Sequence, residues 1–180
     1  MTKIYNTIQE LYDDAIKESD KKGLYLEFGV YKGKSLNNFA KMTPDLKWYG
    51  FDSFEGNPER WREGFEMGVF YCGEPPKVEN NVELVTGLFQ ESLEPFIKNH
   101  SENVSFIHID CDLYSSSKYV LSTLKDKIVS GTIVVFDELG GYDGYEAHEY
   151  RAFKQFIKET GKKYECLGHH AYVQYLVKFL

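Results

Sequence analysis

The sequence predicts an α/β fold in which helices cover both faces of a mostly parallel, doubly wound sheet. Five short apolar segments typical of strands alternate with segments of helical periodicity. Residues 104–109 are apolar on both faces, as in a strand buried in the middle of a parallel sheet. Two final strand-like segments lie close enough in sequence to pair as a hairpin, which adds an antiparallel edge strand.

Length and composition indicate one globular domain, residues 1–180. The chain is 42% hydrophobic and 16% aromatic, enough for one sizeable core. Its formal charge of -7 and the absence of a Lys/Arg cluster argue against nucleic acid as a partner. We find no signal peptide and no apolar run long enough to cross a membrane, which indicates a cytoplasmic protein. The three cysteines show no metal-type spacing and are expected to be reduced.

The first half of the chain contains two predicted helices and three strands. A run of apolar residues at helical spacing predicts a first helix that Gly23 ends: Ile4, Ile8, Leu11, Ala15 and Ile16. Strands are expected at residues 24–28, 48–52 and 82–86, and a helix at 36–42. The glycine turn at 29–35 lets a ligand approach the backbone and aims helix N–H groups at an anion.

A long irregular segment, residues 55–81, separates the second and third strands. It contains three prolines, several glycines and the aromatic residues Trp61, Phe65, Phe70 and Tyr71. A loop of this length inside a compact domain is usually functional or mobile. We interpret it as a lid-like insertion. The alternative is an ordinary surface excursion whose aromatic side chains pack on the core.

The second half continues the alternation. Helices are expected at residues 92–99, 115–128 and 145–160, with serines at 115–117 capping the second of them. A last parallel strand is expected at 132–136. The closing hairpin pairs 164–167 with 172–179, joined by residues 168–170.

Acidic residues follow several of the predicted strands at the edge where open α/β sheets bind ligands. Asp110 and Asp112 follow the central strand, and Asp137 and Glu138 follow the next. Asp52 stands 25 residues after Glu27, where an acid can accept hydrogen bonds from ribose hydroxyls. A turn or cap role is the alternative for Asp52, as it is for the acids after the central strand.

Taken together, the motifs resemble class I S-adenosylmethionine-dependent methyltransferases, and more narrowly the macrocin O-methyltransferase family of metal-dependent enzymes. The resemblance covers nearly the whole chain and rests on these segments: LEFGVYKGKS at 26–35, GFDSFEG at 50–56, GLFQESL at 87–93, IHIDCDLYSS at 107–116 and VFDE at 135–138, with His148 and Glu149. It implies a seven-stranded Rossmann-like sheet with an antiparallel last strand.

The resemblance also implies roles for individual residues. Glu27, Gly29 and Ser35 would hold the methionine end of the cofactor, Asp52 and Ser53 the ribose, and Gly87 and Phe89 the adenine. Asp110 would serve both cofactor and metal, Asp137 and Glu138 would complete the Mg²⁺ site, and Asp112, with Asp110, would act in catalysis. Glu138 departs from the Asp more usual in the family, and the chain lacks the longer N-terminal extension of typical members, so a homo-oligomer stays an open expectation.

The residue types agree with this chemistry. Oxygen ligands suit a hard cation such as Mg²⁺, and no paired His or Cys favours a softer metal. A cation acidifies and orients a hydroxyl, and a nearby carboxylate then takes its proton. His108, inside a strand, is interpreted as a packed core histidine. His169 and His170, like His148 and Glu149, could position substrate or base.

The sequence therefore predicts a divalent-metal-assisted O-methyltransferase that uses S-adenosylmethionine and acts on a small polyhydroxylated acceptor, such as a sugar or glycosylated metabolite. A catechol-type acceptor is the alternative with the same chemistry. A noncatalytic nucleotide-binding module is an alternative of another class. A nicotinamide or flavin oxidoreductase is disfavoured because the turn after the first strand lacks the GxGxxG pattern.

Overall fold

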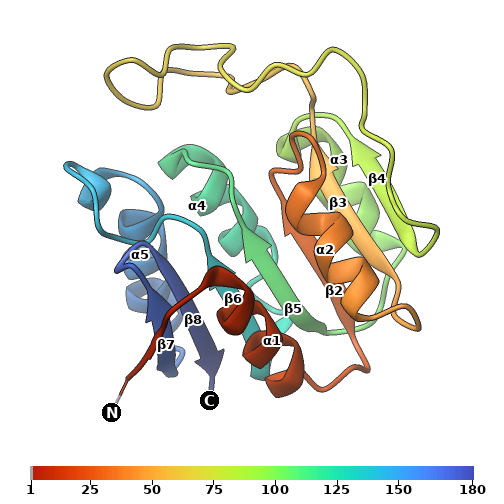
Figure 1. Ribbon diagram of the computed structural model, residues 1–180, viewed down its shortest axis with the longest axis vertical. Helices are drawn as coiled ribbons and strands as arrows, with labels where there is room; N and C mark the ends of the chain where they lie inside the picture. Colours follow the sequence, from red (N-terminus) through yellow and green to blue (C-terminus); the bar gives the residue numbers. More distant parts are fainter. Residues whose placement is uncertain (1) are drawn as a thin grey trace.

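The computed structural model describes residues 2–180 and contains one eight-stranded mixed sheet with helices on both faces (Figure 1). The order of the strands across the sheet is β1-β7-β8-β6-β5-β2-β3-β4. The strands are β1 (Lys3–Tyr5), β2 (Leu24–Phe28), β3 (Trp48–Asp52), β4 (Val82–Thr86), β5 (Val104–Ile109), β6 (Ile128–Phe136), β7 (Tyr164–His170) and β8 (Gln174–Phe179). The helices are α1 (Ile8–Glu18), α2 (Lys34–Met42), α3 (Phe89–Lys98), α4 (Tyr114–Thr123) and α5 (Glu149–Thr160), with a 3-10 turn, η1 (Tyr145–Ala147).

The predicted fold class is confirmed. β5 lies inside the sheet and pairs in parallel with β2 and β6, while β3 and β4 extend the parallel part outward. β8 runs antiparallel to both of its neighbours, β6 and β7. The carboxyl ends of β2 to β6 therefore meet at one edge of the sheet, and the segments after them are brought together there.

Two apolar layers hold the helices against the sheet. On one face, α1 and α2 pack Leu11 and Phe39 against Phe106. On the other face, α3, α4 and α5 pack side chains such as Phe96, Val120 and Phe153 against the same strands. All six residues of β5 are buried, as expected for a strand that is covered on both faces.

Local sequence explains where several helices begin and end. Thr7 caps α1 because its hydroxyl accepts the N–H of Glu10. Gly161 ends α5 in a left-handed conformation, φ 67°, that glycine adopts without strain. α4 begins at Tyr114 after an N-cap at Leu113, whose side chain makes no cap hydrogen bond, so the predicted serine cap is wrong.

Several predicted boundaries need correction. Ile4 does not belong to the first helix but to β1, an edge strand on β7, and this strand raises the predicted count of seven to eight. α1 ends at Glu18, well before Gly23.

The antiparallel strand β8 is not at the edge but between β6 and β7, where it pairs on both sides. Residues 168–170 belong to β7, so the hairpin turn is 171–173. The helix expected up to residue 128 stops at Thr123, because Ile128 already begins β6.

Residues 53–81 contain no helix and no named strand, and an isolated bridge pairs Arg62 with Phe65. Figure 1 shows this segment, in yellow, crossing beyond one edge of the sheet. Among residues 2–180, no helix has the length and apolar character needed to cross a membrane.

Candidate active site

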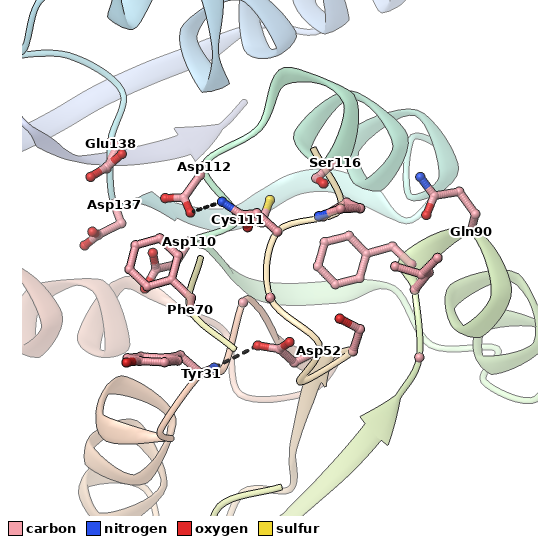
Figure 2. Close-up of a pocket in the computed structure, with 18 residues that line it drawn as sticks. Tyr31, Asp52, Phe70, Gln90, Asp110, Cys111, Asp112, Ser116, Asp137 and Glu138 are labelled. Carbon is pink, nitrogen blue, oxygen red and sulfur yellow. Dashed lines mark hydrogen bonds between the residues drawn. The ribbon is translucent and has the colours of Figure 1, made fainter. Parts of the chain in front are cut away.

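A cavity of about 320 Å³ lies at the carboxyl ends of the parallel strands (Figure 2). Segments that follow β2, β3, β4, β5 and β6 all contribute to its lining. Nine of the residues predicted to form the site line it, namely Gly29, Asp52, Ser53, Gly87, Phe89, Asp110, Asp112, Asp137 and Glu138. The other two predicted site residues, Glu27 and Ser35, do not.

Gly29 allows the chain after β2 to lie directly against the chain after β5. Its φ is +92°, and a Cβ atom placed there would lie 1.7 Å from the carbonyl oxygen of Asp110. Only glycine fits such a close approach. The position of Asp110 in the cavity therefore depends on the absence of a side chain at residue 29.

Asp52 organises the turn that follows β2 through its carboxylate. Oδ2 accepts the N–H groups of Val30 and Tyr31, each at 2.8 Å, and Oδ1 accepts the N–H of Phe54 at 2.8 Å. The turn role weighed from the sequence is thus present. Both lone pairs of Oδ2 are thus engaged, whereas Oδ1 keeps one free, and because the residue lines the cavity this oxygen can still accept a ligand hydroxyl.

Carboxylates from two strand ends meet on one side of the cavity. Figure 2 shows Asp110, Asp112, Asp137 and Glu138 gathered there. Burial, followed by the nearby charges of Asp137 and Asp112, raises the pKa of Asp110 well above its usual range. Burial also raises the pKa of Asp112 to about 6 and that of Glu138 to about 8. A cation among these groups would offset their mutual repulsion.

Glu149 ties together the two loops that carry these acids. Its side chain is fully buried at the start of α5. Oε1 accepts the N–H of Cys111 and Oε2 accepts the N–H of Glu138, each at 3.3 Å. One carboxylate thus joins the segment after β5 to the segment after β6.

His108 and Glu27 form a buried pair beneath the acids. Both side chains are 0% exposed, and Nδ1 of His108 lies 2.8 Å from Oε2 of Glu27. The hydroxyl of Ser35 donates to Oε1 of Glu27. The histidine is packed in the core as predicted, yet one of its nitrogens also belongs to a group with carboxylate oxygens of Asp110 and Asp137, all within 4.8 Å of one another. These donor types fit a divalent cation. Glu138 is outside this group.

A second cavity of about 890 Å³ meets the first at the acids. Both cavities are lined by Tyr31, Asp110 and Asp137. The second is bounded by residues of α1 and α2 and includes Ser35 and His170 in its lining. Asp110 and Asp137 therefore face two spaces at once.

The irregular segment contacts the rim of the site. Nδ2 of Asn57 donates to Oδ2 of Asp112 at 3.0 Å, and the hydroxyl of Ser115 donates to Glu59 at 2.5 Å. Trp61 is 5% exposed and packs against the rings of Tyr142 and His148. The aromatic side chain of Trp61 is thus tucked onto the protein, while the part that includes Asn57 and Phe70 also lines the first cavity.

Sequence reasoning missed the part played by His108, and it did not single out Asn57. For His108 a signal existed: it lies on β5 two residues before Asp110, which directly follows the strand, and alternate residues of an extended segment point to the same face. Its partner Glu27 lies opposite it in the register of β2 and β5. The contact of Asn57 depends on the path of a long loop, which leaves no local sequence signal.

Comparisons with known proteins agree with this architecture. A family model described as "Methyltransferase domain" matches residues 26–139. No curated protein matches the sequence. The calicheamicin methyltransferase CalS11 has a similar structure, with a TM-score of 0.75 at 22% identity over 95% of this chain and 79% of that chain. The O-methyltransferase NovP gives 0.68 at 17% identity over 95% and 77%. MycE methyltransferase from the mycinamycin biosynthetic pathway, in complex with Mg and SAH, gives 0.61 at 15% identity and covers 94% of this chain but 48% of that chain. At these identities the likenesses show a shared fold.

Proposed function

The chain belongs to the methyltransferase domain family, and from that membership we propose that it transfers a methyl group from S-adenosylmethionine to a hydroxyl oxygen of a small polyhydroxylated acceptor, with the help of a divalent cation. The observation that carries the proposal is that Asp110 and Asp137 line both cavities. A cation held there would lie at the junction of the two cavities, near Asp112, which lines the first.

The first cavity suits the adenosine part of the cofactor. Oδ1 of Asp52 offers its free lone pair to a ribose hydroxyl, with Ser53 beside it in the lining. Gly87 and Phe89 lie along the same cavity, and an aromatic face there can pack against adenine. The methionine end would lie past Gly29 toward Ser35. Because Glu27 lines neither cavity, it would act through the hydroxyl of Ser35 that it holds.

The acidic side of the cavity suits activation of a hydroxyl. A divalent cation, when bound by Asp110 and Asp137, lowers the pKa of a coordinated hydroxyl and orients it. Asp112 lies close to these ligands, and its carboxylate can accept the proton that the hydroxyl loses. Asn57 holds Oδ2 of Asp112 in place by donating a hydrogen bond. Methyl transfer then depends on alignment of the oxygen behind the methyl group, so positioning contributes much of the rate.

The acceptor class is supported by the names of similar structures. CalS11 is also described as a TDP-rhamnose 3'-O-methyltransferase, and MycE was solved with Mg and SAH. We therefore propose a sugar or glycosylated metabolite as the acceptor. A catechol would offer the same vicinal oxygens to the cation and is the second candidate. A noncatalytic binding module would retain the cofactor cavity but would not need converging acids.

The metal role is tested by Asp137→Ala, because this change removes one carboxylate from the junction of the cavities while leaving the adenosine side unchanged. We expect metal-dependent methyl transfer to fall to background across a panel of sugars, nucleotide sugars and catechols. Binding of S-adenosylhomocysteine, measured by calorimetry, should stay within about threefold of the wild type, since no adenosine contact is lost.

The control is Asp143→Ala, which removes an exposed acid from the loop after β6 outside the cavity. It should retain full transfer. Full metal-dependent activity in Asp137→Ala would reject the metal assignment. Failure of the wild-type protein to bind S-adenosylhomocysteine would reject the proposed function as a whole.

A further inference from the structure

We propose that the cation is bound by one imidazole and two carboxylates, His108, Asp110 and Asp137, and that the site therefore takes a divalent transition-metal ion such as Mn²⁺ in preference to Mg²⁺. This inference rests on the metal-assisted part of the proposed function and deepens it. It replaces the oxygen-only ligand set expected from the sequence with a mixed one, and it assigns His108 a role in the site.

The first support is geometric. One nitrogen of His108 and one oxygen from each of Asp110 and Asp137 all lie within 4.8 Å of one another. Ligands at about 2.1 Å from one ion are at most about 4.2 Å apart. Small side-chain adjustments would therefore bring all three atoms onto a single ion. Asp110 directly follows β5 and stands two residues after His108, so alternation continued past the end of the strand places both side chains on the same face.

The second support is an unpartnered nitrogen. His108 is 0% exposed, and its Nε2 has no hydrogen-bond partner within residues 2–180. A buried polar atom without a partner destabilises the folded state, so such atoms are uncommon in folded proteins. Because Nδ1 is already engaged by Glu27, Nε2 is the nitrogen available to a ligand. A metal ion would satisfy it.

The surroundings of His108 resemble those of a metal ligand. Metal-binding histidines usually donate their second ring N–H to a carboxylate, which fixes the tautomer and the ring orientation. Here Nδ1 faces Glu27, and Glu27 in turn accepts the hydroxyl of Ser35. The rings of Tyr12 and Phe39 meet the imidazole edge-on, at centroid distances of 5.7 and 5.3 Å. The ring is thus held in one orientation from several sides.

Charge also favours a cation at this point. Glu27, Asp110 and Asp137 bring three carboxyl groups together around one imidazole. Among residues 2–180, no Lys or Arg forms an ion pair with any of the three. Carboxylates gathered at buried or half-buried positions are usually compensated by a bound cation or by protonation. A divalent ion bound to a neutral imidazole would balance most of this negative charge.

Glu138 fits the third ligand position less well. Its carboxyl lies outside the group within 4.8 Å, and the charge of Arg62 acts on it from the irregular segment. His108 is the residue in the group that adds a donor other than oxygen, and this decides the class of metal. Carboxylates alone suit Mg²⁺, whereas an imidazole raises affinity for later divalent ions in the order Mn²⁺, Fe²⁺, Co²⁺, Ni²⁺.

The test uses Mn²⁺ as the probe on the full chain with S-adenosylhomocysteine present. Pulsed electron paramagnetic resonance of bound Mn²⁺ should show coupling to a ¹⁴N nucleus in the wild type. His108→Gln keeps an N–H donor for Glu27 but removes the imidazole, so the coupling should vanish and the Kd for Mn²⁺ should rise more than about 100-fold. The Kd for Mg²⁺ should rise less, because Mg²⁺ gains less from an imidazole ligand.

Two further variants complete the experiment. Glu27→Gln leaves the imidazole in place but weakens its support, so the ¹⁴N coupling should persist while the Kd for Mn²⁺ rises about 10–100-fold. If His108→Gln does not fold, the ¹⁴N coupling in the wild type and its persistence in Glu27→Gln still decide whether a nitrogen atom binds the ion. His100→Gln alters a histidine that lines neither cavity and should leave both readouts unchanged.

The outcomes separate this inference from the proposed function. Bound Mn²⁺ without ¹⁴N coupling, or with coupling that survives in His108→Gln, would overturn the nitrogen ligand and leave metal-assisted transfer intact. Methyl transfer without binding of any divalent ion would overturn both the nitrogen ligand and the metal role. Coupling that is present in the wild type and in Glu27→Gln but absent in His108→Gln would support the inference.

Discussion

At the scale of single residues, the site depends on two atoms that the sequence does not make conspicuous. One is the missing Cβ of Gly29, which lets the carbonyl of Asp110 approach the turn after β2. The other is Nε2 of His108, which is buried without a hydrogen-bond partner within residues 2–180. Both act through close approach between segments that are far apart in sequence, and both can be tested by single substitutions.

Gly29→Ala should lower the free energy of unfolding by more than the strain of its positive φ alone would. Gly131 is a matched control, because it has the same φ of +92° and a Cβ atom added there would meet no atom within 4 Å. Gly131→Ala is expected to cost about 1 kcal/mol of unfolding free energy from backbone strain. Gly29→Ala is expected to cost more than about 3 kcal/mol, since overpacking against the Asp110 carbonyl adds to the strain.

The measurement is chemical denaturation of both variants together with calorimetric binding of S-adenosylhomocysteine. Gly29→Ala should lose both stability and binding, whereas Gly131→Ala should keep its binding. Equal stability losses in the two variants would show that the contact with Asp110 does not matter.

Residue types predicted much of the cavity lining, because acids and glycines after strands leave a local signal. Asp52, Asp110 and Asp137 were found in this way and all line the cavity. The spacing of His108 and Asp110 was a signal within one segment, but the pairing of His108 with Glu27 depends on the register between β5 and β2. The oxygen-only ligand set was therefore the natural expectation from sequence.

At the scale of elements, the strands of the parallel part were predicted well and the ends of the chain less well. Residues 24–28, 48–52, 82–86 and 104–109 form strands as expected, because short buried apolar runs bounded by turns identify them. The place of β8 between β6 and β7 could not be predicted, since a hairpin in sequence does not say which of its strands pairs with the rest of the sheet. The edge strand β1 is three residues long, too short for a periodic pattern.

The irregular segment is the element whose role is most open to experiment. Its contacts with the site are anchored by Trp61, which is 5% exposed, whereas Tyr71 in the same segment is 67% exposed. Trp61→Ala should detach the segment, so that trypsin cleaves after Arg60 and Arg62 at least about tenfold faster than in the wild type. The thermal midpoint should change little, because the sheet core is untouched.

Tyr71→Ala is the matched control and should leave the rate of cleavage unchanged. Because Asn57 and Phe70 line the first cavity, S-adenosylhomocysteine should slow cleavage of the wild type. If Trp61→Ala is cleaved no faster than the wild type, Trp61 does not hold the segment in place. If the ligand gives no protection, the segment is a surface excursion rather than a lid.

At the scale of the whole molecule, a doubly wound sheet brings the ends of five strands to one edge, and the methyltransferase family to which the chain belongs supplies the chemistry proposed for that edge. Two cavities meet at a pair of carboxylates from the residues that directly follow the adjacent strands β5 and β6. Glu149 joins the loops after these strands from the start of α5. The sheet, the loops and the helix together hold Asp110 and Asp137 at the junction of the two cavities.

The most direct test of this account is a crystal structure of the protein grown with S-adenosylhomocysteine and Mn²⁺, with anomalous diffraction used to locate the ion. We expect the nucleoside in the cavity of about 320 Å³ between Asp52 and Phe89, and one anomalous peak between Asp110 and Asp137. A nucleoside bound elsewhere, or no ion between these two carboxylates at saturating Mn²⁺, would contradict the account.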